Sequence, residues 1–251
     1  MTTAGRLAAR IEAELRDHGD PVRGAGARRY LKIDLECLGC GAAVIRSTVD
    51  GALREEPGLD RRGLVALVRA LWVRPAWDVR AAAMVLLERR ADLLAPSDLP
   101  LLERLIRDSG TWALVDGLAV HAVGPLVGRH PKLEATLDRW VRDEDLWVRR
   151  SALLAHLLPL RRGGGDFARF ARRADALLEE REFFIRKAIG WVLRETGKKR
   201  PELVAAWLEP RLARASGLTV REAVRWLPAR LKRALLAGQR AAAPRAGTRP
   251  G

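Results

Sequence analysis

Trp112 and Asp116 stand out in the stretch from Gly110 to Val120, because an acid interrupts a run of apolar residues there. In an α-helix, residues four apart share one face, so the indole and the carboxylate would lie side by side. A carboxylate next to an aromatic ring forms a small site that attracts a cation. The alternative is structural: Asp116 pairs with arginines of neighbouring helices and Trp112 fills the core. Both interpretations depend on the elements that position the two side chains.

The sequence gives little indication of a metal site or of a disulfide. Its two cysteines, Cys37 and Cys40, lie in a single Cys-Leu-Gly-Cys motif, which supplies too few ligands for a structural zinc site. The histidines show no ligand spacing that would complete one; they are His18, His121, His130 and His156. We therefore predict no metal or other cofactor. A redox pair is the alternative for the cysteines, and we favour two thiols in a reducing cytoplasm.

The charge of the chain predicts a polyanionic partner. Lys and Arg number 46 against 31 Asp and Glu, for a net charge of +15. Coding bias could also enrich arginine, but it need not unbalance the two signs. No apolar run is long enough for a membrane span, and the N-terminal residues lack the apolar core of a signal peptide. We expect a protein of a bacterial-type cytoplasm that associates with the nucleoid through DNA.

A short pattern recurs along the chain: an aliphatic residue, then Arg, then a helix-forming apolar run. It begins at Ile45, Val79, Val148, Ile185 and Val220. The interval from Val79 to Val148 is about twice the others, which predicts a further copy near its middle. Val115 stands there, followed by Asp116 in place of the arginine. The chain therefore contains six copies with a period of about 35 residues.

Other segments with helical periodicity alternate with these copies. They begin at Leu99, Pro131, Phe167 and Pro201. Because strand-type alternation is almost absent, we predict an all-α chain, an α-solenoid of about six helix pairs that bury their apolar faces on one another. We assign residues 1–237 to one repeat domain, with a loop over residues 161–166. The basic, Pro/Gly/Ala-rich residues 238–251 are predicted to form a disordered tail.

The aliphatic-Arg pair near the start of each second helix resembles the HEAT repeat. That resemblance implies that the second helices line a concave, basic groove. We call the position after the aliphatic residue the arginine column; its members are Arg46, Arg80, Asp116, Arg149, Arg186 and Arg221. The column residues either contact phosphates or stabilise the stacked helices.

Three motifs follow one another on this chain: TWALVDGLA, LWVRRSALL and FFIRKAIGWVLRE. In this order and spacing they resemble the AlkD family of DNA alkylation repair glycosylases. The likeness runs from about Tyr30 to Trp226 and is strongest between Ala76 and Glu195. It implies excision of purines alkylated at N3 or N7 from double-stranded DNA, by cleavage of the N-glycosidic bond. It also implies that the damaged base is not flipped out of the duplex.

The same resemblance implies which residues form the site. Asp116 matches the family's catalytic carboxylate, and Trp112 matches the tryptophan that packs on the sugar of the lesion. Arg150 matches the arginine that holds the DNA backbone near the lesion, and Trp191 matches a second groove tryptophan. Apart from the resemblance, we expect further DNA contacts from residues of the basic groove and its surroundings: Arg149, Arg186, Lys187, Tyr30 and Trp226.

The chemistry agrees with these residue types on independent grounds. A purine alkylated at N3 or N7 is cationic, so it leaves as a neutral base and needs no general acid. A carboxylate and indole faces then favour an oxocarbenium-like transition state, and the carboxylate can orient the attacking water. Two neighbours differ from many family members: Thr111 and Ala113 stand where those have a tryptophan and an acid. Only the pair matched to the chemistry is retained.

Three classes of function remain in comparison. We favour a glycosylase that acts on alkylpurines, because four matched residues occur together: Trp112, Asp116, Arg150 and Trp191. We expect it to be monofunctional, because no lysine nucleophile matches the site; the nearest lysine to consider is Lys187. The second class is a non-catalytic paralogue that binds distorted or branched DNA, and the third is a scaffold for an acidic protein. In each case we expect a monomer without an obligate protein partner. Small methyl lesions and bulky minor-groove adducts both stay open as substrates.

Overall fold

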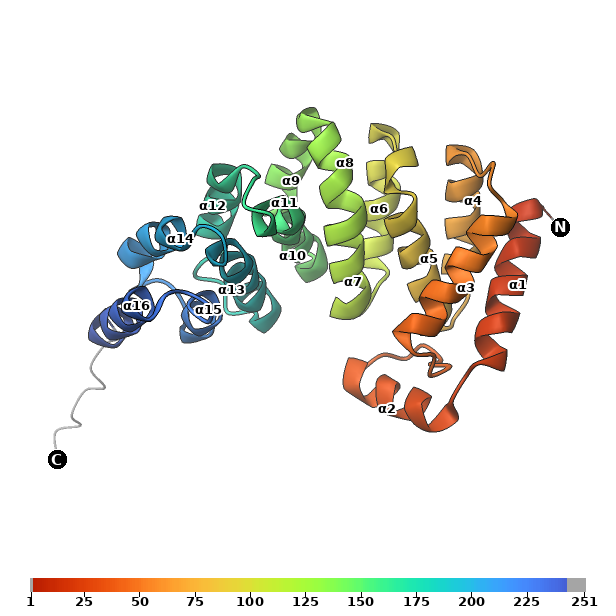
Figure 1. Cartoon of the computed structure of the whole chain (residues 1–251), viewed down its shortest axis with the longest axis horizontal. Helices are drawn as coiled ribbons and strands as arrows, with labels where there is room; N and C mark the ends of the chain where they lie inside the picture. Colours follow the sequence, from red (N-terminus) through yellow and green to blue (C-terminus); the bar gives the residue numbers. More distant parts are fainter. Residues whose placement is uncertain (1, 243–251) are drawn as a thin grey trace. The chain divides into compact units, whose positions relative to one another are not determined.

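A computed structural model describes residues 2–242, which form α-helices joined by short turns (Figure 1). Within this range there is no β-strand, and only Glu36 and Ala76 form an isolated bridge. The prediction of an all-α chain is confirmed. The described residues form two compact units, one ending at Leu133 and the other beginning at Glu134.

The helices form six successive pairs, as the repeat pattern predicts. The first helices are α1 (Thr3–Asp17), α4 (Arg61–Trp72), α6 (Leu99–Arg107), α9 (Glu134–Trp140), α12 (Phe167–Ala176) and α14 (Pro201–Leu208). The second helices are α3 (Ala42–Glu55), α5 (Trp77–Arg89), α7 (Trp112–Leu118), α10 (Leu146–Leu154), α13 (Phe183–Gly197) and α15 (Gly217–Ala223). Other helices are α2 (Pro21–Leu31), α8 (Gly124–Arg129), α11 (Leu157–Arg161) and α16 (Ala229–Ala242).

The aliphatic residue of the repeat pattern is buried in every copy. At most 4% of its surface is exposed at Ile45, Val79, Val115, Val148, Ile185 and Val220. Burying an aliphatic side chain of this size contributes about 1.5–3 kcal/mol. The pattern therefore marks where each second helix enters the core, and the column residue that follows lies beside that core.

The Cys-Leu-Gly-Cys loop is fastened to the start of α5 by a buried carboxylate. Asp78 accepts hydrogen bonds from the backbone N–H groups of Leu38, at 2.6 Å, and Cys40, at 2.9 Å. Cys37 and Cys40 are free thiols. Burial raises the pKa of both thiols, that of Cys40 to about 11. Both are therefore protonated at neutral pH, which favours a structural role over redox chemistry.

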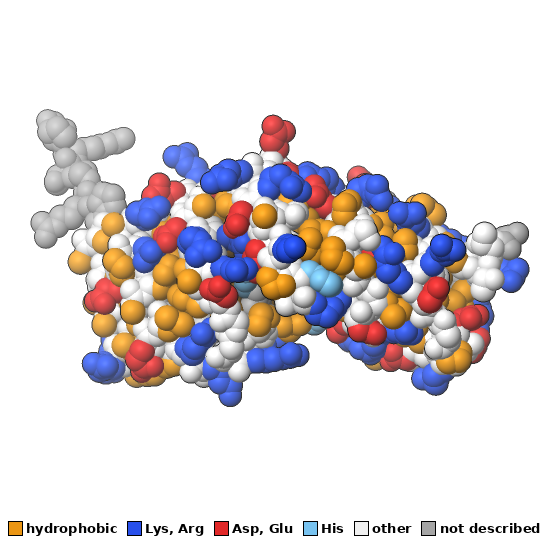
Figure 2. Space-filling model, turned by 90° about the horizontal axis from the view of Figure 1, so that it is seen from above, with side chains coloured by type: hydrophobic (Ala, Val, Ile, Leu, Met, Phe, Trp, Pro, Cys, Tyr) orange, Lys and Arg blue, Asp and Glu red, His pale blue; other side chains and the backbone are white. Residues whose placement is uncertain are grey.

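Arginines bridge successive helix pairs within each unit. Their carboxylate partners lie about one repeat away in sequence, with N–O distances of 2.6 to 3.0 Å; examples are Arg61–Asp98, Arg89–Asp50, Arg161–Glu195 and Arg211–Asp175. On the face shown in Figure 2, Lys and Arg side chains lie among Asp and Glu side chains. Part of the arginine content therefore serves the fold.

The predicted boundary of the tail is too early. Helix α16 runs to Ala242, so residues 238–242 are helical and not disordered. Leu235 anchors this helix by burying its side chain, and the Ala-rich sequence that follows it favours continuation of the helix. The remainder of the predicted tail, residues 243–251, lies outside the described residues.

Candidate active site

Trp112 is the first residue of α7, and Asp116 lies one turn further along. Thr111 caps this helix, because its hydroxyl accepts a hydrogen bond from the N–H of Ala113 at 3.5 Å. Trp112 and Asp116 are both half-buried, whereas Val115 is fully buried. Helix α7 therefore directs the indole and the carboxylate to one partly exposed face, as the spacing of four residues predicts.

Helix α7 packs closely on α5 at Gly117, the residue after Asp116. A β-carbon on the next residue, Gly117, would lie only 1.9 Å from the sulfur of Met84 in α5. The absence of a side chain at Gly117 thus lets α7 approach α5. After Leu118 the helix continues as a π-helical turn, Ala119–Val123, and then as α8.

The π-helical turn has a clear origin in the sequence. Pro125 has no N–H to donate and would clash with the carbonyl one turn earlier in a regular α-helix. The preceding N–H, of Gly124, instead donates to the carbonyl of Ala119, five residues back. Single π turns of this kind occur often next to functional sites. Here the turn directly follows the helical segment that carries Asp116.

Tyr30 lies against Trp112. The two rings form an edge-to-face contact, with centroids 5.9 Å apart and planes at 87°. Tyr30 belongs to α2, which is inserted between the helices of the first pair, and 71% of its surface is exposed. The structure therefore brings this predicted DNA contact next to the predicted site tryptophan within the first unit.

Two column arginines use their donors within the protein. In the first unit, Arg80 donates to the carbonyl of Asp108 at 3.0 Å. In the second unit, Arg149 donates to the carbonyls of Asp143 and Glu144, both at 2.8 Å, and pairs with Glu180 at 2.9 Å. Only 15% of the Arg149 side chain is exposed. These contacts favour the stabilising role for Arg149 over the predicted phosphate contact.

Arg150 is held at the junction of α10 and α13. Only 3% of its surface is exposed, and it donates a hydrogen bond to the carbonyl of Phe184. Its guanidinium also lies 5.6 Å from the centroid of the Phe184 ring, which contacts the ring of Trp147 at 5.1 Å. Trp147 thus packs against Phe184. Arg150 is fixed in position, with little surface exposed.

Helix α13 carries three of the other predicted contacts. Arg186 donates through Nε to the carbonyl of Glu180 at 2.7 Å. Lys187 is exposed, with its ammonium 5.5 Å from the centroid of the Phe183 ring. Trp191 lies one turn beyond Lys187 and is half-buried. The indole and the two cations therefore lie along one helix of the second unit.

Trp226 lies beyond α15, and 57% of its surface is exposed. The guanidinium of Arg225 lies 5.5 Å from its ring centroid. The predicted residues thus divide between the units. The first unit carries Tyr30, Trp112 and Asp116, whereas the second carries Arg149, Arg150, Arg186, Lys187, Trp191 and Trp226.

A buried polar cluster in the second unit was missed by the sequence analysis. Arg173 is 2% exposed and pairs with Asp138 and Glu134, each at 2.7 Å. It also contacts the imidazole of His156. Burial, reinforced by Arg173, lowers the pKa of His156 to about 4, so the imidazole is neutral at pH 7. The spacing of Asp138 and Arg173, close to one repeat, was the available signal.

Among the described residues, no three or more His, Cys, Asp or Glu side chains are grouped so that they could hold a metal ion. Over the same part of the chain, every helix is too short or too polar to span a membrane.

Comparisons with known proteins agree with this fold. The family model described as "DNA alkylation repair enzyme" matches residues 11–227. A solved structure of a predicted DNA alkylation repair enzyme from Enterococcus faecalis superimposes with a TM-score of 0.75 at 21% identity, covering 84% of this chain and 98% of that one. For AlkD2 from Streptococcus mutans the TM-score is 0.59 at 19% identity, covering 76% and 92%. No curated protein sequence matches the chain.

Proposed function

Because the chain belongs to the DNA alkylation repair enzyme family, we propose that it is a monofunctional DNA glycosylase. It hydrolyses the N-glycosidic bond of cationic purines alkylated at N3 or N7 in duplex DNA, without flipping the base. The carrying observation is the start of α7. There an acid replaces the arginine of the column, and Asp116 shares a partly exposed helix face with Trp112.

The reaction needs little more than electrostatic stabilisation. The bond between C1′ and the base nitrogen breaks, and the cationic purine takes the bonding electrons and leaves as a neutral base. Water adds to C1′ and releases a proton, which leaves an abasic site. Asp116 stabilises the positive charge that develops on the sugar and orients the water, while the face of Trp112 covers the sugar.

The second unit supplies the DNA contacts in this proposal. Trp191, Arg186 and Lys187 lie along α13, and the exposed ring of Trp226 follows α15. Arg150 acts near the lesion from its fixed position beside Phe184. Lys187 is exposed and lies over Phe183, which supports hydrolysis over a Schiff-base mechanism. The protein works as a monomer and without a cofactor.

The test measures release of free base from duplex DNA that contains 7-methylguanine or 3-methyladenine. Wild type is compared with Asp116→Asn at saturating DNA, and we expect base release to fall by about 10²–10³ while duplex binding persists. Asp92→Asn is the matched control, because Asp92 is a highly exposed carboxylate of the same unit. Equal release by wild type and Asp116→Asn would disprove the assigned role of Asp116.

The second candidate function is a non-catalytic protein that binds distorted or branched DNA. One observation favours it: the Thr111 hydroxyl caps α7 by accepting a hydrogen bond from the N–H of Ala113, and these are the two positions where the sequence departs from the family pattern that it resembles. Tight binding that weakens steeply with salt, with no release of methylated or bulkier bases by wild type, would support this alternative.

A further inference from the structure

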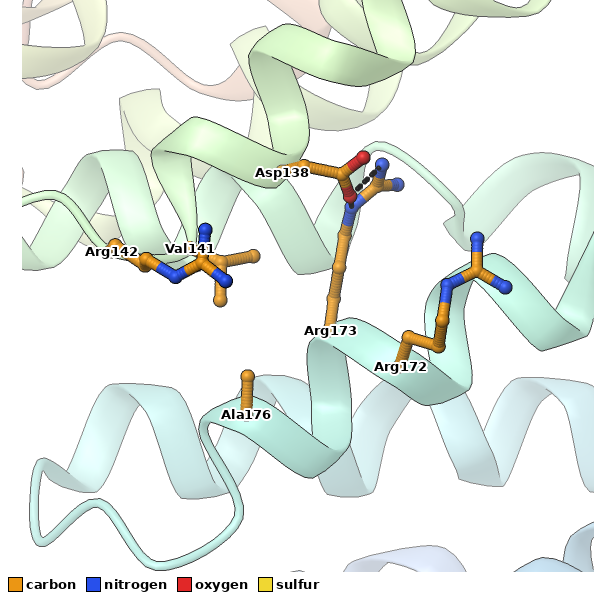
Figure 3. Close-up of a pocket in the computed structure, with 6 residues that line it drawn as sticks. All are labelled: Asp138, Val141, Arg142, Arg172, Arg173 and Ala176. Atoms are coloured by element: carbon orange, nitrogen blue, oxygen red, sulfur yellow. Dashed lines mark hydrogen bonds and ion pairs between the residues drawn. The ribbon is translucent and has the colours of Figure 1, made fainter.

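An open pocket of about 320 Å³ lies on the first helices of the second unit, between α9 and α12. Its lining residues are Asp138, Val141, Arg142, Arg172, Arg173 and Ala176. Asp138 and Arg173 contact each other in the middle of this lining, with Arg142 on one side of the pair and Arg172 on the other (Figure 3). Its residues come from helices other than α10, α13 and α15, which carry the proposed DNA contacts of this unit.

Two arginines of this pocket make no ion pair with a described residue, although the charge of Arg172 helps to lower the pKa of Asp166. The carboxylate of Asp138 is already paired with the buried guanidinium of Arg173, at 2.7 Å. Arg142 and Arg172 are exposed, and their side chains make no hydrogen bond or ion pair with any residue between 2 and 242. An anion can therefore approach the guanidinium group of Arg142 or of Arg172 while the Asp138–Arg173 ion pair between them stays intact.

The first unit contains a pocket of the same construction. It lies between α4 and the 3₁₀ turn Pro96–Asp98, and its volume is about 330 Å³. Arg61 pairs there with the buried Asp98 at 2.7 Å. Arg62 and Arg69 line the same pocket, are exposed, and make no side-chain ion pair or hydrogen bond within the described part of the chain. In each unit, therefore, an Arg–Asp ion pair lines a pocket together with two arginines that make no ion pair in the described part of the chain.

We propose that each pocket binds a backbone phosphate of a nucleic acid, so that each unit carries a second DNA contact on its first helices. Guanidinium groups match phosphate oxygens in charge and planar geometry, and they often bind them in pairs. The only apolar lining residues are small, Val141 and Ala176 in one pocket and Val65 and Ala66 in the other. Such walls lack the aromatic anchors that dominate protein–protein interfaces.

The net charge of +15 fits these second contacts. Many arginines of the chain are neutralised by carboxylates of the next repeat, but the four that flank these pockets are not. They are Arg62, Arg69, Arg142 and Arg172. A second duplex segment on the first helices would neutralise them. This inference goes beyond base excision and does not depend on it.

The experiment counts duplexes per protein. The full-length chain is titrated at low salt with a short, fluorescently labelled, undamaged DNA duplex. Wild type should bind a second duplex after the first. Arg142→Gln/Arg172→Gln should weaken that second event by at least about tenfold, as expected for loss of charge-assisted hydrogen bonds. The salt dependence of the second event should fall by about 0.9 in log–log slope for each phosphate released.

Matched variants keep this test specific. Arg62→Gln/Arg69→Gln should act in the same direction, whereas Arg230→Gln/Arg233→Gln removes equal charge from α16 and should leave the second event intact. A single binding event in wild type would overturn the proposal, as would equal behaviour of the pocket and control variants. Binding of inorganic pyrophosphate to the pockets without a second duplex would also overturn it, because the ligand would then be a small phosphate.

Discussion

At the start of α10, Arg149 donates to two carbonyl oxygens and pairs with Glu180, whereas at the start of α7 the same repeat position holds Asp116. Both helices bury the preceding aliphatic residue completely, Val148 in one and Val115 in the other. The two helices therefore enter their cores in the same way. They differ in the residue beside the core, which binds the protein's own backbone in α10.

This difference teaches where to look for chemistry in a repeat protein. The column arginines Arg80, Arg149 and Arg186 each donate to a backbone carbonyl, so in these three copies the arginine stabilises the fold. A carboxylate cannot donate such hydrogen bonds at neutral pH. The copy in α7 therefore lacks the hydrogen bond from a column arginine to a backbone carbonyl. In this copy Asp116 has Trp112 one turn away on the same helix.

The largest expected effect on base release comes from replacing Asp116 with the arginine that the other copies have at this position. Asp116→Arg gives α7 the residue of the other copies and places a cation where the proposed reaction develops positive charge. We expect base release from a 7-methylguanine duplex to fall by at least about 10²–10³. Single-turnover release at saturating DNA measures this. Asp92→Arg makes the same charge change at an exposed site, and wild-type rates for Asp116→Arg would break the comparison.

The next largest effect concerns His156, which contacts Arg173. Arg173 lies in α12, one of the first helices, and its ion pairs stabilise the fold. Folding lowers the pKa of His156 from about 6.5 to about 4, so the unfolded chain binds more protons between these values. The stability that this histidine contributes is complete above pH 6.5 and is lost as the pH falls through 4. The loss amounts to about 3 kcal/mol.

Urea unfolding between pH 7 and pH 4 measures that loss, and the NMR titration of the imidazole reports the pKa of His156 directly. His156→Gln serves as the control, since removing this imidazole should reduce the pH dependence of unfolding over this range. An imidazole of His156 that titrates near pH 6.5 in the folded protein would contradict the prediction.

A smaller loss of stability is expected at the start of α10. Arg149→Gln removes the donors to Asp143 and Glu144 and the ion pair with Glu180, which should cost about 2 kcal/mol of unfolding free energy. Chemical denaturation measures this. Arg181→Gln is the control, because Arg181 is exposed and makes no side-chain hydrogen bond or ion pair in the described range. Equal midpoints for the two variants would show that the column arginine does not stabilise the repeat.

The helix pairs could be predicted because a buried aliphatic residue at a constant interval leaves a periodic trace in the sequence. Even the hidden copy at Val115 followed from that period. The fate of each column arginine could not be predicted in the same way. Whether Arg149 meets a phosphate or a carbonyl depends on where the loop at Asp143 and Glu144 runs, and loops carry no period.

Two other features lay outside the repeat signal. The end of α16 was placed too early, because a Gly- and Ala-containing basic segment is compatible with both a helix and a tail. Helix α2 is an insertion within the first pair, so no interval in the sequence relates Tyr30 to Trp112. Their contact across more than two repeats of chain arises from tertiary packing alone.

The smallest effect tests that unforeseen contact. Tyr30→Ala removes a ring that holds Trp112 edge-to-face, an interaction of about 0.5–1.5 kcal/mol, so we expect base release to fall about three- to tenfold. Tyr30→Phe keeps the ring and should restore the wild-type rate if Tyr30 acts by orienting Trp112. If Tyr30→Phe is as slow as Tyr30→Ala, the hydroxyl is the functional group and Tyr30 contacts DNA directly. The pair of variants therefore decides whether the first unit carries a Trp112–Asp116 pair supported by an aromatic neighbour or a site of three contacting residues.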